Sequence, residues 1–362
     1  MIRVLHTEWS DGWGGQEIRI INEMLAIRER GVEVYLACRK HAKIKQKAEE
    51  NNIKVFTLPF NGSYDIKTIF NLQKVIKEHN IDIVNTHSGK DTWVGGIASK
   101  LAKVKFIRTR HLSNPINTHR LNFINEMADF IFTTGESVKE AMIKNNRIKP
   151  DKILSIPTGI DETKFDPTKY DKLSCKESFH VSNKGLTIGI LAVLRGFKRH
   201  DIFLDIAKKL TNEFSNQNLQ FLIAGDGPMR EQIKNSIDRL NLTSNVKILG
   251  HVENTPEFLK ALDIFVLTSD KNEGVPQSLM QALLMEIPSV ATTAGSIKDL
   301  HENNNFLISE SDKNKIYENV KKIILDKNAV KTNRKFIVQN FSKKTSTNKI
   351  MRVYKSLMEN TN

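Results

Sequence analysis

The sequence predicts an α/β protein with two doubly wound domains, one after the other along its 362 residues. Short apolar runs rich in β-branched residues alternate with segments of helical periodicity, which is typical of buried parallel strands joined by helices. This alternation stops in a polar stretch near the middle of the chain and then begins again. The length also exceeds what one ordinary hydrophobic core organises. Two such domains are expected to face each other across a cleft.

The first half of the chain carries the first alternation. Its candidate strands are residues 2–5, 32–37, 55–58, 81–84, 106–107 and 130–132. Residues 16–30 place apolar side chains near helical spacing and stop at Gly31, a residue type that often ends helices. Residues 65–79 repeat the pattern, with their apolar side chains on one helix face.

A polar, proline-containing stretch from about residue 161 to 184 interrupts this periodicity and predicts the domain boundary. The second alternation has candidate strands at residues 186–194, 219–224, 246–249, 264–267 and 289–292. The predicted division is a first domain at 1–165, a linker at 166–185, a second domain at 186–340 and a last helix at 341–362, which could return to the first domain.

Composition limits the cellular location. Hydrophobic residues make up 39% of the chain, and the longest apolar runs are far shorter than a membrane span. We expect no secretory signal, because acidic residues follow the first strand closely. Cys38 and Cys175 provide neither a disulfide framework nor a metal-binding spacing. A cytoplasmic protein is therefore predicted.

The formal net charge of +14 indicates anionic partners, such as nucleotides or a membrane surface. Basic residues concentrate in two stretches, 39–54 and 100–120. A lysine-rich, solvated surface would give the same composition. Because no RNA-binding aromatic motif accompanies these charges, we expect no nucleic acid partner.

The most informative segment is residues 273–281, Glu-Gly-Val-Pro-Gln-Ser-Leu-Met-Gln, which follows a candidate strand. Pro276 suits the first turn of a helix, where its missing N–H costs nothing. The free amide groups of that turn favour an anion such as phosphate, and the Glu273 carboxylate can hold hydroxyl groups. The segment therefore predicts a nucleotide-sugar site, although an ordinary turn between a strand and a helix could have the same sequence pattern.

Two cations, Arg195 and Lys198, follow the first strand of the second domain. Doubly wound domains bind ligands at the carboxyl ends of their strands. Two cations at such a position would hold a diphosphate and neutralise it as it departs, without a metal ion. A cation is unfavourable at the start of a helix, so its presence here favours a ligand over an ordinary charged surface.

Glycine loops follow strands in both halves of the chain. Gly12, Gly14 and Gly15 come after the first strand, and Gly225 and Gly227 follow a strand of the second domain. Glycine lets backbone N–H groups approach a ligand, although a tight turn would need the same residue type. The spacing is not that of the dinucleotide fingerprint, which argues against a dehydrogenase.

Two histidines, His87 and His111, end candidate strands of the first domain. Each could present a polar group to a ligand. Each could equally be a hydrogen-bonded structural residue, which is the commoner role for a single histidine at a strand end.

Taken together and in this order, these segments resemble the family-four retaining glycosyltransferases of bacterial cell-envelope polysaccharide or lipopolysaccharide synthesis, which have the B-type fold of two Rossmann-like domains. The resemblance covers nearly the whole chain and is most specific over residues 246–300. Glu273 matches the first position of the family's Glu–seven residues–Glu motif, whereas Gln281 stands at the second. Gly14 and Gly15 are similar to the family's glycine loop, and the segment 157–161 matches a further landmark.

The resemblance implies a retaining transfer from a nucleoside-diphosphate sugar to a glycan or lipid-linked glycan acceptor. Glu273 would hold the donor sugar, and Arg195 and Lys198 would bind the diphosphate. Gln281 would take the place of the carboxylate that usually holds the ribose, with less charge assistance. The implied donor-binding residues are Gly14, Gly15, Gly225, Gly227, Gly274, Val275, Pro276 and Gln281.

The family's acceptor-side histidine most resembles His111, and His87 is the second choice. No cofactor or metal is expected, because no Asp-x-Asp motif stands at a strand end. The two basic stretches would allow peripheral docking on the inner face of the cytoplasmic membrane. Two alternatives stay open: a nucleotide-sugar 2-epimerase of the same fold, and a non-catalytic partner of a transferase complex, for which Gln281 would be a sign of decay.

Overall fold

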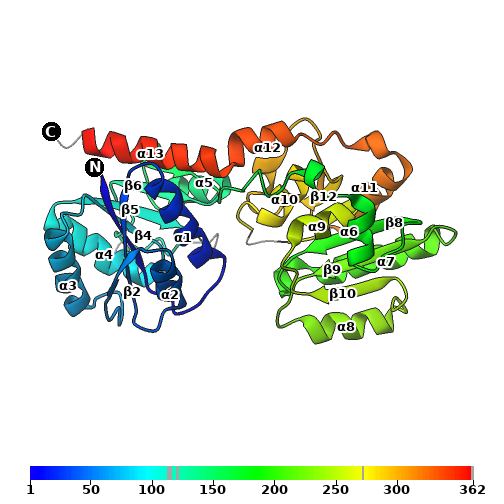
Figure 1. The fold of residues 1–362 in the computed structure, drawn as a ribbon, viewed down its shortest axis with the longest axis horizontal. Helices are drawn as coiled ribbons and strands as arrows, with labels where there is room; N and C mark the ends of the chain where they lie inside the picture. The colour runs from blue at the N-terminus through cyan, green and yellow to red at the C-terminus, as the bar shows by residue number, and fades with distance from the viewer. Residues whose placement is uncertain (112–115, 120–121, 271–272, 360–362) are drawn as a thin grey trace. The chain divides into compact units, whose positions relative to one another are not determined.

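The computed structural model describes residues 1–111, 116–119, 122–270 and 273–359 (Figure 1). The chain divides into two compact units. Unit 1 comprises Met1–Gly159 and Lys343–Asn362, and unit 2 comprises Ile160–Ser342. Each unit is built on one parallel sheet with helices, so the predicted α/β class with a doubly wound domain in each half is confirmed.

In the described part of unit 1, seven parallel strands form one sheet in the order β3-β2-β1-β4-β5-β6-β7. The strands are β1 (Arg3–Glu8), β2 (Glu33–Cys38), β3 (Lys54–Thr57), β4 (Ile83–Thr86), β5 (Lys105–Arg110), β6 (Phe130–Thr133) and β7 (Ile153–Ser155). The helices are α1 (Gly15–Arg28), α2 (Lys43–Glu50), α3 (Ile66–Glu78), α4 (Gly89–Ala102), α5 (Glu136–Asn145), the 3-10 turn η1 (Pro150–Lys152) and α13 (Lys343–Glu359). The strand order reverses between β1 and β4, where folds of this type bind ligands.

Over the residues described in unit 2, six parallel strands have the order β10-β9-β8-β11-β12-β13, which reverses between β8 and β11. The strands are β8 (Leu186–Leu191), β9 (Leu219–Ala224), β10 (Val246–Gly250), β11 (Ile264–Leu267), β12 (Ser289–Thr292) and β13 (Leu307–Ser309). The helices are α6 (Lys172–Ser178), α7 (His200–Glu213), α8 (Arg230–Arg239), α9 (Thr255–Ala261), α10 (Gln277–Leu284), α11 (Lys313–Leu325) and α12 (Arg334–Phe341). The 3-10 turns are η2 (Pro167–Lys169), η3 (Gly196–Lys198), η4 (Ile297–Leu300) and η5 (Lys327–Ala329).

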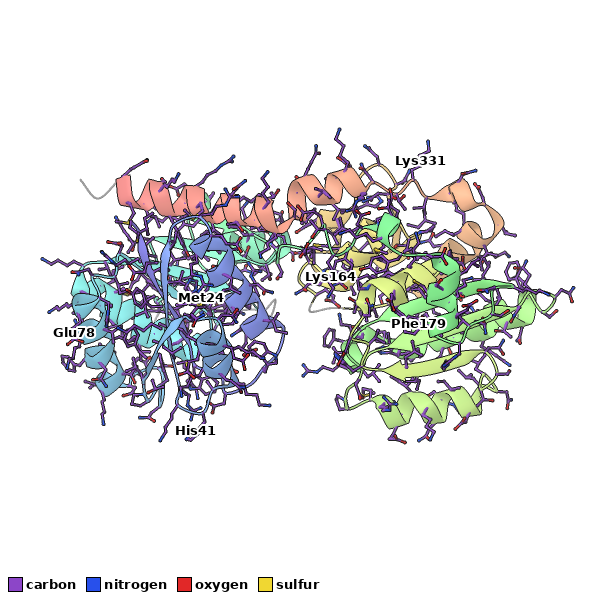
Figure 2. The ribbon with its side chains drawn as sticks, in the orientation of Figure 1. Met24, His41, Glu78, Lys164, Phe179 and Lys331 are labelled. Atoms are coloured by element: carbon purple, nitrogen blue, oxygen red, sulfur yellow. The ribbon has the colours of Figure 1, made fainter. Side chains whose placement is uncertain are left out.

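Both sheets are covered on both faces by apolar clusters, as the short apolar runs of the sequence require. In unit 1, Met24 of α1 is fully buried (Figure 2). The last helix, α13, packs against α1 (Figure 1) and buries Tyr354 completely, with its ring 6.4 Å from that of Phe132. This packing makes the end of the chain part of unit 1.

The structure divides the chain at other positions than the sequence suggested. Residues 166–185, predicted to be a linker, belong to unit 2 and contain η2 and α6. Helix α6 packs against α9, and Phe179 (labelled in Figure 2) meets Phe258 edge-on at 5.7 Å. Lys176, which is buried, forms an ion pair with Asp263 at 2.9 Å. The sequence of residues 166–185 is mostly polar because α6 is short and buries only a few of its side chains in the core.

Candidate functional site

In unit 2, the carboxylate of Glu273 is buried beyond the carboxyl end of β11. Its Oε1 accepts a hydrogen bond from the Ser269 hydroxyl at 2.6 Å and forms an ion pair with the Lys198 ammonium group. Its Oε2 has no hydrogen bond with any described residue and is not enclosed. One oxygen therefore fixes the side chain, and the other can accept a hydrogen bond from a ligand.

The loop that carries Glu273 is held in place through its backbone, which contacts the loop at residues 295–296. The Ser296 N–H donates to the Glu273 carbonyl oxygen at 3.3 Å. Gly295 has a φ of +56°, and a Cβ at this position would lie 1.8 Å from the same oxygen. Only glycine therefore fits at residue 295, which the sequence analysis did not select because its partner lies on another loop.

Helix α10 begins directly after this loop, with Pro276 as its N-cap. Proline has no side-chain acceptor for the first amide groups, and no described residue accepts from the N–H groups of Gln277, Ser278 or Leu279. An uncapped helix start favours an anion. The helix start predicted at Pro276 is correct to within one residue.

Three further predicted residues lie on or near α10, and their surroundings differ. Val275 is buried in the apolar cluster beneath the loop, so its side chain contributes packing. Gly274 and Gln281 are half-buried. The Gln281 side chain makes no hydrogen bond with the residues that the structure describes, which leaves its amide available to a ligand.

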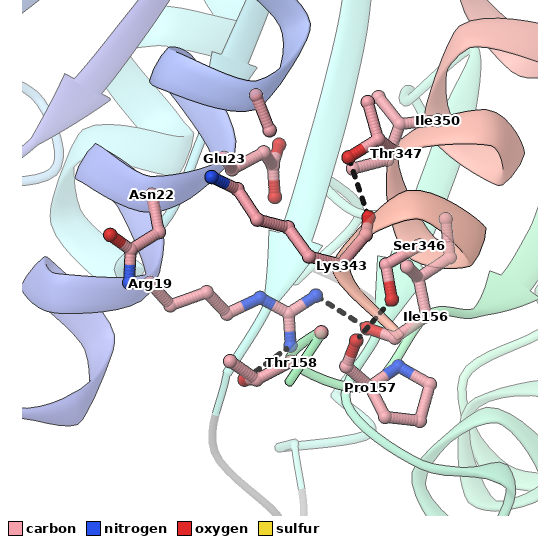
Figure 3. Close-up of a pocket in the computed structure, with 12 residues that line it drawn as sticks. Arg19, Asn22, Glu23, Ile156, Pro157, Thr158, Lys343, Ser346, Thr347 and Ile350 are labelled. Atoms are coloured by element: carbon pink, nitrogen blue, oxygen red, sulfur yellow. Dashed lines mark hydrogen bonds between the residues drawn. The ribbon is translucent and has the colours of Figure 1, made fainter. Parts of the chain in front are cut away.

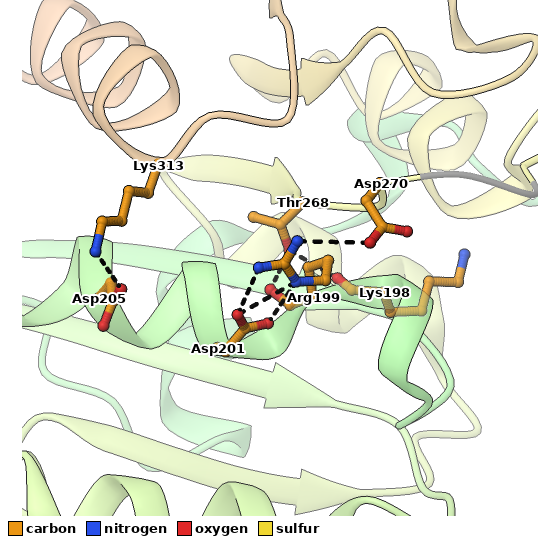
Figure 4. Close-up of polar contacts among 7 residues, drawn as sticks. All are labelled: Lys198, Arg199, Asp201, Asp205, Thr268, Asp270 and Lys313. Carbon is orange, nitrogen blue, oxygen red and sulfur yellow. Dashed lines mark hydrogen bonds and ion pairs between the residues drawn. The ribbon is translucent and has the colours of Figure 1, made fainter.

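The basic loop after β8 is anchored to β11. The Thr268 hydroxyl donates to the carbonyl oxygens of Lys198 and Arg199 at 2.8 and 3.0 Å. Figure 4 shows the Arg199 guanidinium between two carboxylates, those of Asp201 at 2.8 Å and Asp270 at 3.5 Å. These contacts hold the loop at the carboxyl edge of the sheet.

The two predicted diphosphate ligands of this loop have different surroundings. Lys198 is buried and paired with Glu273, an arrangement that the sequence analysis did not anticipate. Arg195 is exposed and has neither an ion pair nor a side-chain hydrogen bond among the described residues. Arg195 is therefore the freer of the two cations to bind an anion.

A cavity of about 290 Å³ adjoins Arg195, between the start of α7 and α8. It is lined by Arg195, Gly196, His200, Asp201, Leu204, Met229, Gln232, Ile233 and Ser236. Burial, together with the charge of Lys198, lowers the pKa of His200 to about 4. The imidazole is therefore neutral at physiological pH.

The glycines after β9 fit closely against the loop after β8. A Cβ on Gly225, which has a φ of +137°, would lie 1.9 Å from the Ala192 carbonyl oxygen. A Cβ on Gly227 would lie 2.7 Å from the carbonyl oxygen of Leu194. Their small size is thus required for backbone packing inside unit 2, whatever they contribute to a ligand.

We expect Gly225→Ala to lower the free energy of unfolding by at least about 2 kcal/mol without any ligand, because both the positive φ and the close contact oppose a side chain. Gly196→Ala is the matched control, since no described atom would lie within 4 Å of its Cβ. Urea denaturation followed by fluorescence measures both. Equal stability of the two variants would contradict this packing role.

In unit 1, the predicted glycine loop leads into α1. Gly14 is the N-cap in an extended conformation, and its N–H donates to the Glu17 carboxylate at 2.8 Å. A Cβ on Gly15 would meet no described atom within 4 Å, and one on Gly14 would meet only Glu17, at 3.6 Å. Nothing in the described part of unit 1 therefore requires glycine at either position.

The histidines of unit 1 form a continuous chain. His87 Nδ1 lies 2.9 Å from His111 Nε2, and His87 Nε2 lies 2.9 Å from Nδ1 of His6, a residue that the sequence analysis did not select. His6 lies inside β1, directly after the candidate strand at residues 2–5, a position similar to those of His87 and His111. The two predicted histidines are thus joined, and their roles cannot be separated by position alone.

Buried carboxyl groups flank this chain. Asp91 accepts hydrogen bonds from the Thr7 hydroxyl at 2.7 Å and from the backbone N–H groups of His87 and Ser88 at 2.9 and 2.8 Å. Glu8 accepts from the Ser10 N–H at 2.7 Å. Burial, together with the nearby charge of Asp91, raises the pKa of Glu8 to about 8.

The raised pKa of Glu8 predicts a pH-dependent stability. The folded state binds this proton more tightly than the unfolded state, so the resulting stabilisation is complete below pH 4.5 and is lost as the pH rises through about 8. We expect wild type to lose about 1.4 kcal/mol per pH unit relative to Glu8→Gln within this window. Thermal unfolding across the pH range measures this difference. Glu78→Gln, at an exposed site, is the control, and parallel curves for wild type and Glu8→Gln would refute the assignment.

The landmark at residues 157–161 serves the packing of α13. Arg19 donates to the Ile156 carbonyl oxygen and, at 3.4 Å, to the Thr158 hydroxyl, beside a small cavity of about 40 Å³ (Figure 3). A Cβ on Gly159 would lie 2.7 Å from the Lys343 Cα. The glycine therefore allows the two segments at which the chain passes between the units to lie close together.

The described residues contain no group of three or more histidine, cysteine, aspartate or glutamate side chains that could hold a metal ion. The predicted independence from metals stays a prediction, since charge on a departing group can also be neutralised by a metal that the substrate brings.

Residues 13–164 match the family model described as Glycosyltransferase Family 4, and residues 175–343 match that of Glycosyl transferases group 1. A relative from Escherichia coli, UDP-Gal:alpha-D-GlcNAc-diphosphoundecaprenol alpha-1,3-galactosyltransferase, is 25% identical over 99% of this chain and 98% of its own. The O-antigen biosynthesis glycosyltransferase WbnH, also from Escherichia coli, is 25% identical over 80% of this chain and 82% of its own.

Solved structures share the fold. A glycosyltransferase from Rickettsia africae superposes with a TM-score of 0.89 at 19% identity and covers 99% of both chains. HepE from Anabaena, in complex with UDP-glucose, superposes with a TM-score of 0.81 at 19% identity and covers 98% of this chain and 100% of its own. At these identities the likeness establishes the B-type glycosyltransferase fold.

Proposed function

The chain belongs to the glycosyltransferases, with a family 4 domain followed by a group 1 domain, and we propose that it moves a sugar from a nucleoside-diphosphate sugar to a glycan or lipid-linked glycan with retention of configuration. The observation that carries this proposal is the buried pair of Glu273 and Lys198 beside the uncapped start of α10, with Arg195 on the same loop as Lys198. It combines a hydrogen-bond acceptor for sugar hydroxyls with positive groups for a diphosphate. The names of two similar proteins, which mention UDP-Gal and UDP-glucose, support a donor of this class.

Unit 2 would bind the donor. Glu273 would accept a hydrogen bond from a sugar hydroxyl through Oε2, while Lys198 and Ser269 hold Oε1. Arg195 and the first amide groups of α10 would bind the phosphates. The Gln281 amide would bond the ribose. These groups stabilise the diphosphate as negative charge develops on it, which is where electrostatic stabilisation accelerates transfer.

Retention would follow from attack on the face from which the diphosphate departs. The bond between the sugar C1 and the phosphate oxygen breaks, and a bond forms between C1 and the acceptor oxygen. The acceptor proton passes to the departing phosphate oxygen, so no protein base is required. The positive groups of unit 2 keep that phosphate in place for the proton transfer.

Unit 1 would bind the acceptor, with His111 as its polar contact. The half-buried His111 follows β5 at the carboxyl edge of the sheet, where the strand order allows ligand binding. A lipid-linked acceptor is supported by the diphosphoundecaprenol in the name of the galactosyltransferase relative.

A donor screen tests the function. Purified protein is mixed with UDP, GDP, ADP and CDP sugars, and its unfolding temperature is measured, because a ligand that binds the folded state raises it. The stabilising donor is then incubated with lipid-linked glycans and the product's anomeric configuration is read by NMR. We expect transfer with retention. Isomerisation of the donor without acceptor would identify an epimerase, and no turnover of any donor would favour a non-catalytic partner.

Membrane docking is proposed for the same unit, although its two basic stretches contribute unequally. Between residues 100 and 120, Arg108 is buried and Lys100 pairs with Asp129 at 2.8 Å, while Arg120 lies outside the described residues. In α2, Lys45 and Lys47 each have an ion pair with a glutamate of the same helix. No described helix is long and apolar enough to cross a membrane, so contact with lipid would be peripheral.

Exposed apolar side chains near the start of α3, a helix that covers the other face of the sheet from α2, would be a second point of contact with lipid. Tyr64, Ile66 and Phe70 are 71%, 66% and 64% exposed, and Lys67 and Lys74 are exposed beside them. Apolar side chains flanked by lysines suit an anionic bilayer, at about 1 kcal/mol for each basic residue near the surface.

We expect sedimentation with anionic liposomes that weakens at high salt. Charge reversal of Lys43, Lys45 and Lys47 to glutamate should reduce it, and Phe70→Ser should reduce it further. Leu325→Ser, which alters an exposed leucine of unit 2, is the control. Absence of binding at low salt, or binding that neither set of changes affects, would rule out this docking surface.

A further inference from the structure

Three neighbouring strands of unit 1 bring His6, His87 and His111 into one line. β1, β4 and β5 are adjacent in the sheet, and the residues lie in or directly after them. The His6 and His87 rings are stacked with centroids 5.2 Å apart, and those of His87 and His111 are 5.1 Å apart. Two nitrogen–nitrogen distances of 2.9 Å connect the three rings. His6 and His87 are fully buried, whereas His111 is half-buried.

All three imidazoles are neutral at physiological pH. Burial lowers the pKa of His6 to about 3. Burial, together with neighbouring positive groups that include Arg19 and Arg108, also lowers the pKa of His87 and His111 well below the usual value. A neutral imidazole has one N–H donor and one bare nitrogen acceptor.

This geometry allows only two proton arrangements with both hydrogen bonds formed. If His6 Nδ1–H donates to His87 Nε2, then His87 must donate through Nδ1–H to His111 Nε2, and His111 carries its proton on Nδ1. If His111 donates through Nε2–H, the order reverses and all three rings carry the proton on Nε2. The three histidines therefore share one tautomer in either case.

We propose that His6 and His87 are positioning residues, which fix the ring orientation and the tautomer of His111 and so decide whether its Nδ1 offers a donor or an acceptor to a ligand. His111 Nδ1 has no hydrogen bond with a described residue and is not enclosed, so it is the nitrogen that a ligand can reach. The consequence for sugar transfer rests on the proposed function. The shared tautomer rests only on the geometry of the three histidines.

The inner end of the histidine chain, at His6, explains why the order of the protons is fixed. His6 Nε2 is buried and has no hydrogen-bond partner among the described residues. A change from one proton arrangement to the other would require a proton to be added to the histidine at one end and removed from the histidine at the other. Because the inner nitrogen is buried, proton exchange there is opposed, which holds the arrangement and gives the inner histidines the role of orienting His111.

Nitrogen-15 NMR of imidazole-labelled protein tests this without any substrate. Long-range nitrogen–proton spectra distinguish Nδ1–H from Nε2–H, and variants of each histidine assign the signals. We expect the same single tautomer at residues 6, 87 and 111. Different tautomers among these three histidines, or a mixture of tautomers at His111 in wild type, would overturn the proposal.

Substitution of His6 provides the second test. His6→Phe retains an aromatic ring but no donor or acceptor, so the His111 tautomer should become mixed. His6→Asn should shift it less, because its amide occupies the position of Nδ1 and can keep a hydrogen bond with His87 Nε2. His79→Phe is the control, since His79 lies in the same unit against Tyr35 and Phe56. An unchanged His111 signal in folded His6→Phe would refute coupling.

Kinetics separate this inference from the proposed function. Once a donor is known, His6→Phe should lower kcat with acceptor by at least about tenfold while the donor KM stays the same. His6→Asn should restore most of this loss. If the protein turns over no donor, the NMR result still stands, and if the NMR result fails, the donor site of unit 2 is unaffected.

Discussion

Replacement of Glu273 by glutamine should lower turnover by about a hundredfold, which corresponds to roughly 3 kcal/mol of barrier. A neutral amide can still bond with Ser269 but loses the charge that strengthens a hydrogen bond from the sugar. Because that bond is proposed to strengthen as the sugar develops positive charge, the loss should fall on kcat more than on the donor KM.

Glutamine is a better test than alanine because its amide oxygen can still accept a hydrogen bond from the Lys198 ammonium group, although it does not neutralise the charge. Both groups are buried, and alanine would leave the ammonium group without any partner, at about 3–5 kcal/mol of stability. An inactive Glu273→Ala variant could therefore simply be unfolded. Glu253→Gln, at an exposed position in the same unit, is the control. Turnover close to wild type in folded Glu273→Gln would remove Glu273 from the mechanism.

Arg195→Ala should reduce turnover by at least about a hundredfold and leave stability unchanged. Arg195 is exposed and has no ion pair with any residue that the structure describes, so its loss disturbs no internal contact. The expected effect arises from the diphosphate, which loses a cation as its negative charge grows. Arg239→Ala, an exposed arginine on α8, should behave like wild type in both turnover and thermal unfolding.

The same assay with a chelator tests independence from metals. Activity should persist in excess EDTA, because positive groups of the protein would take the part of a divalent cation. Lys198→Met should also be nearly inactive, although its effect must be read beside its unfolding temperature, since Glu273 loses its partner. Activity that disappears on chelation and returns with magnesium or manganese would contradict the proposed role of the cations.

Local sequence patterns determined the fold class and the main loops of the candidate site. Alternating apolar runs and helical periodicity are short-range properties, and they predicted two doubly wound domains before any contact was known. Pro276 and the glutamate before it likewise predicted a helix start beside a carboxylate. Such patterns are local, because each one lies within a few residues of the helix or strand that it predicts.

The tertiary structure decided which of these residues meet. Lys198 and Glu273 are 75 residues apart, and they form a pair because β8 and β11 are neighbours in the sheet. The order of strands in a parallel sheet is set by how helices cover its faces, and no local pattern encodes it. Gly225, which faces Ala192, is explained by the same kind of contact.

The histidine chain shows this division most clearly. His6 directly follows the apolar run at residues 2–5, and its own segment does not show which residues it meets. It becomes part of a site only because β1 lies beside β4, and β4 beside β5. The sequence by itself thus determined the elements and the residues at their ends. Packing of the sheets decided the partners, since hydrogen bonds and ion pairs form between side chains that only the folded chain brings within 3 Å of one another.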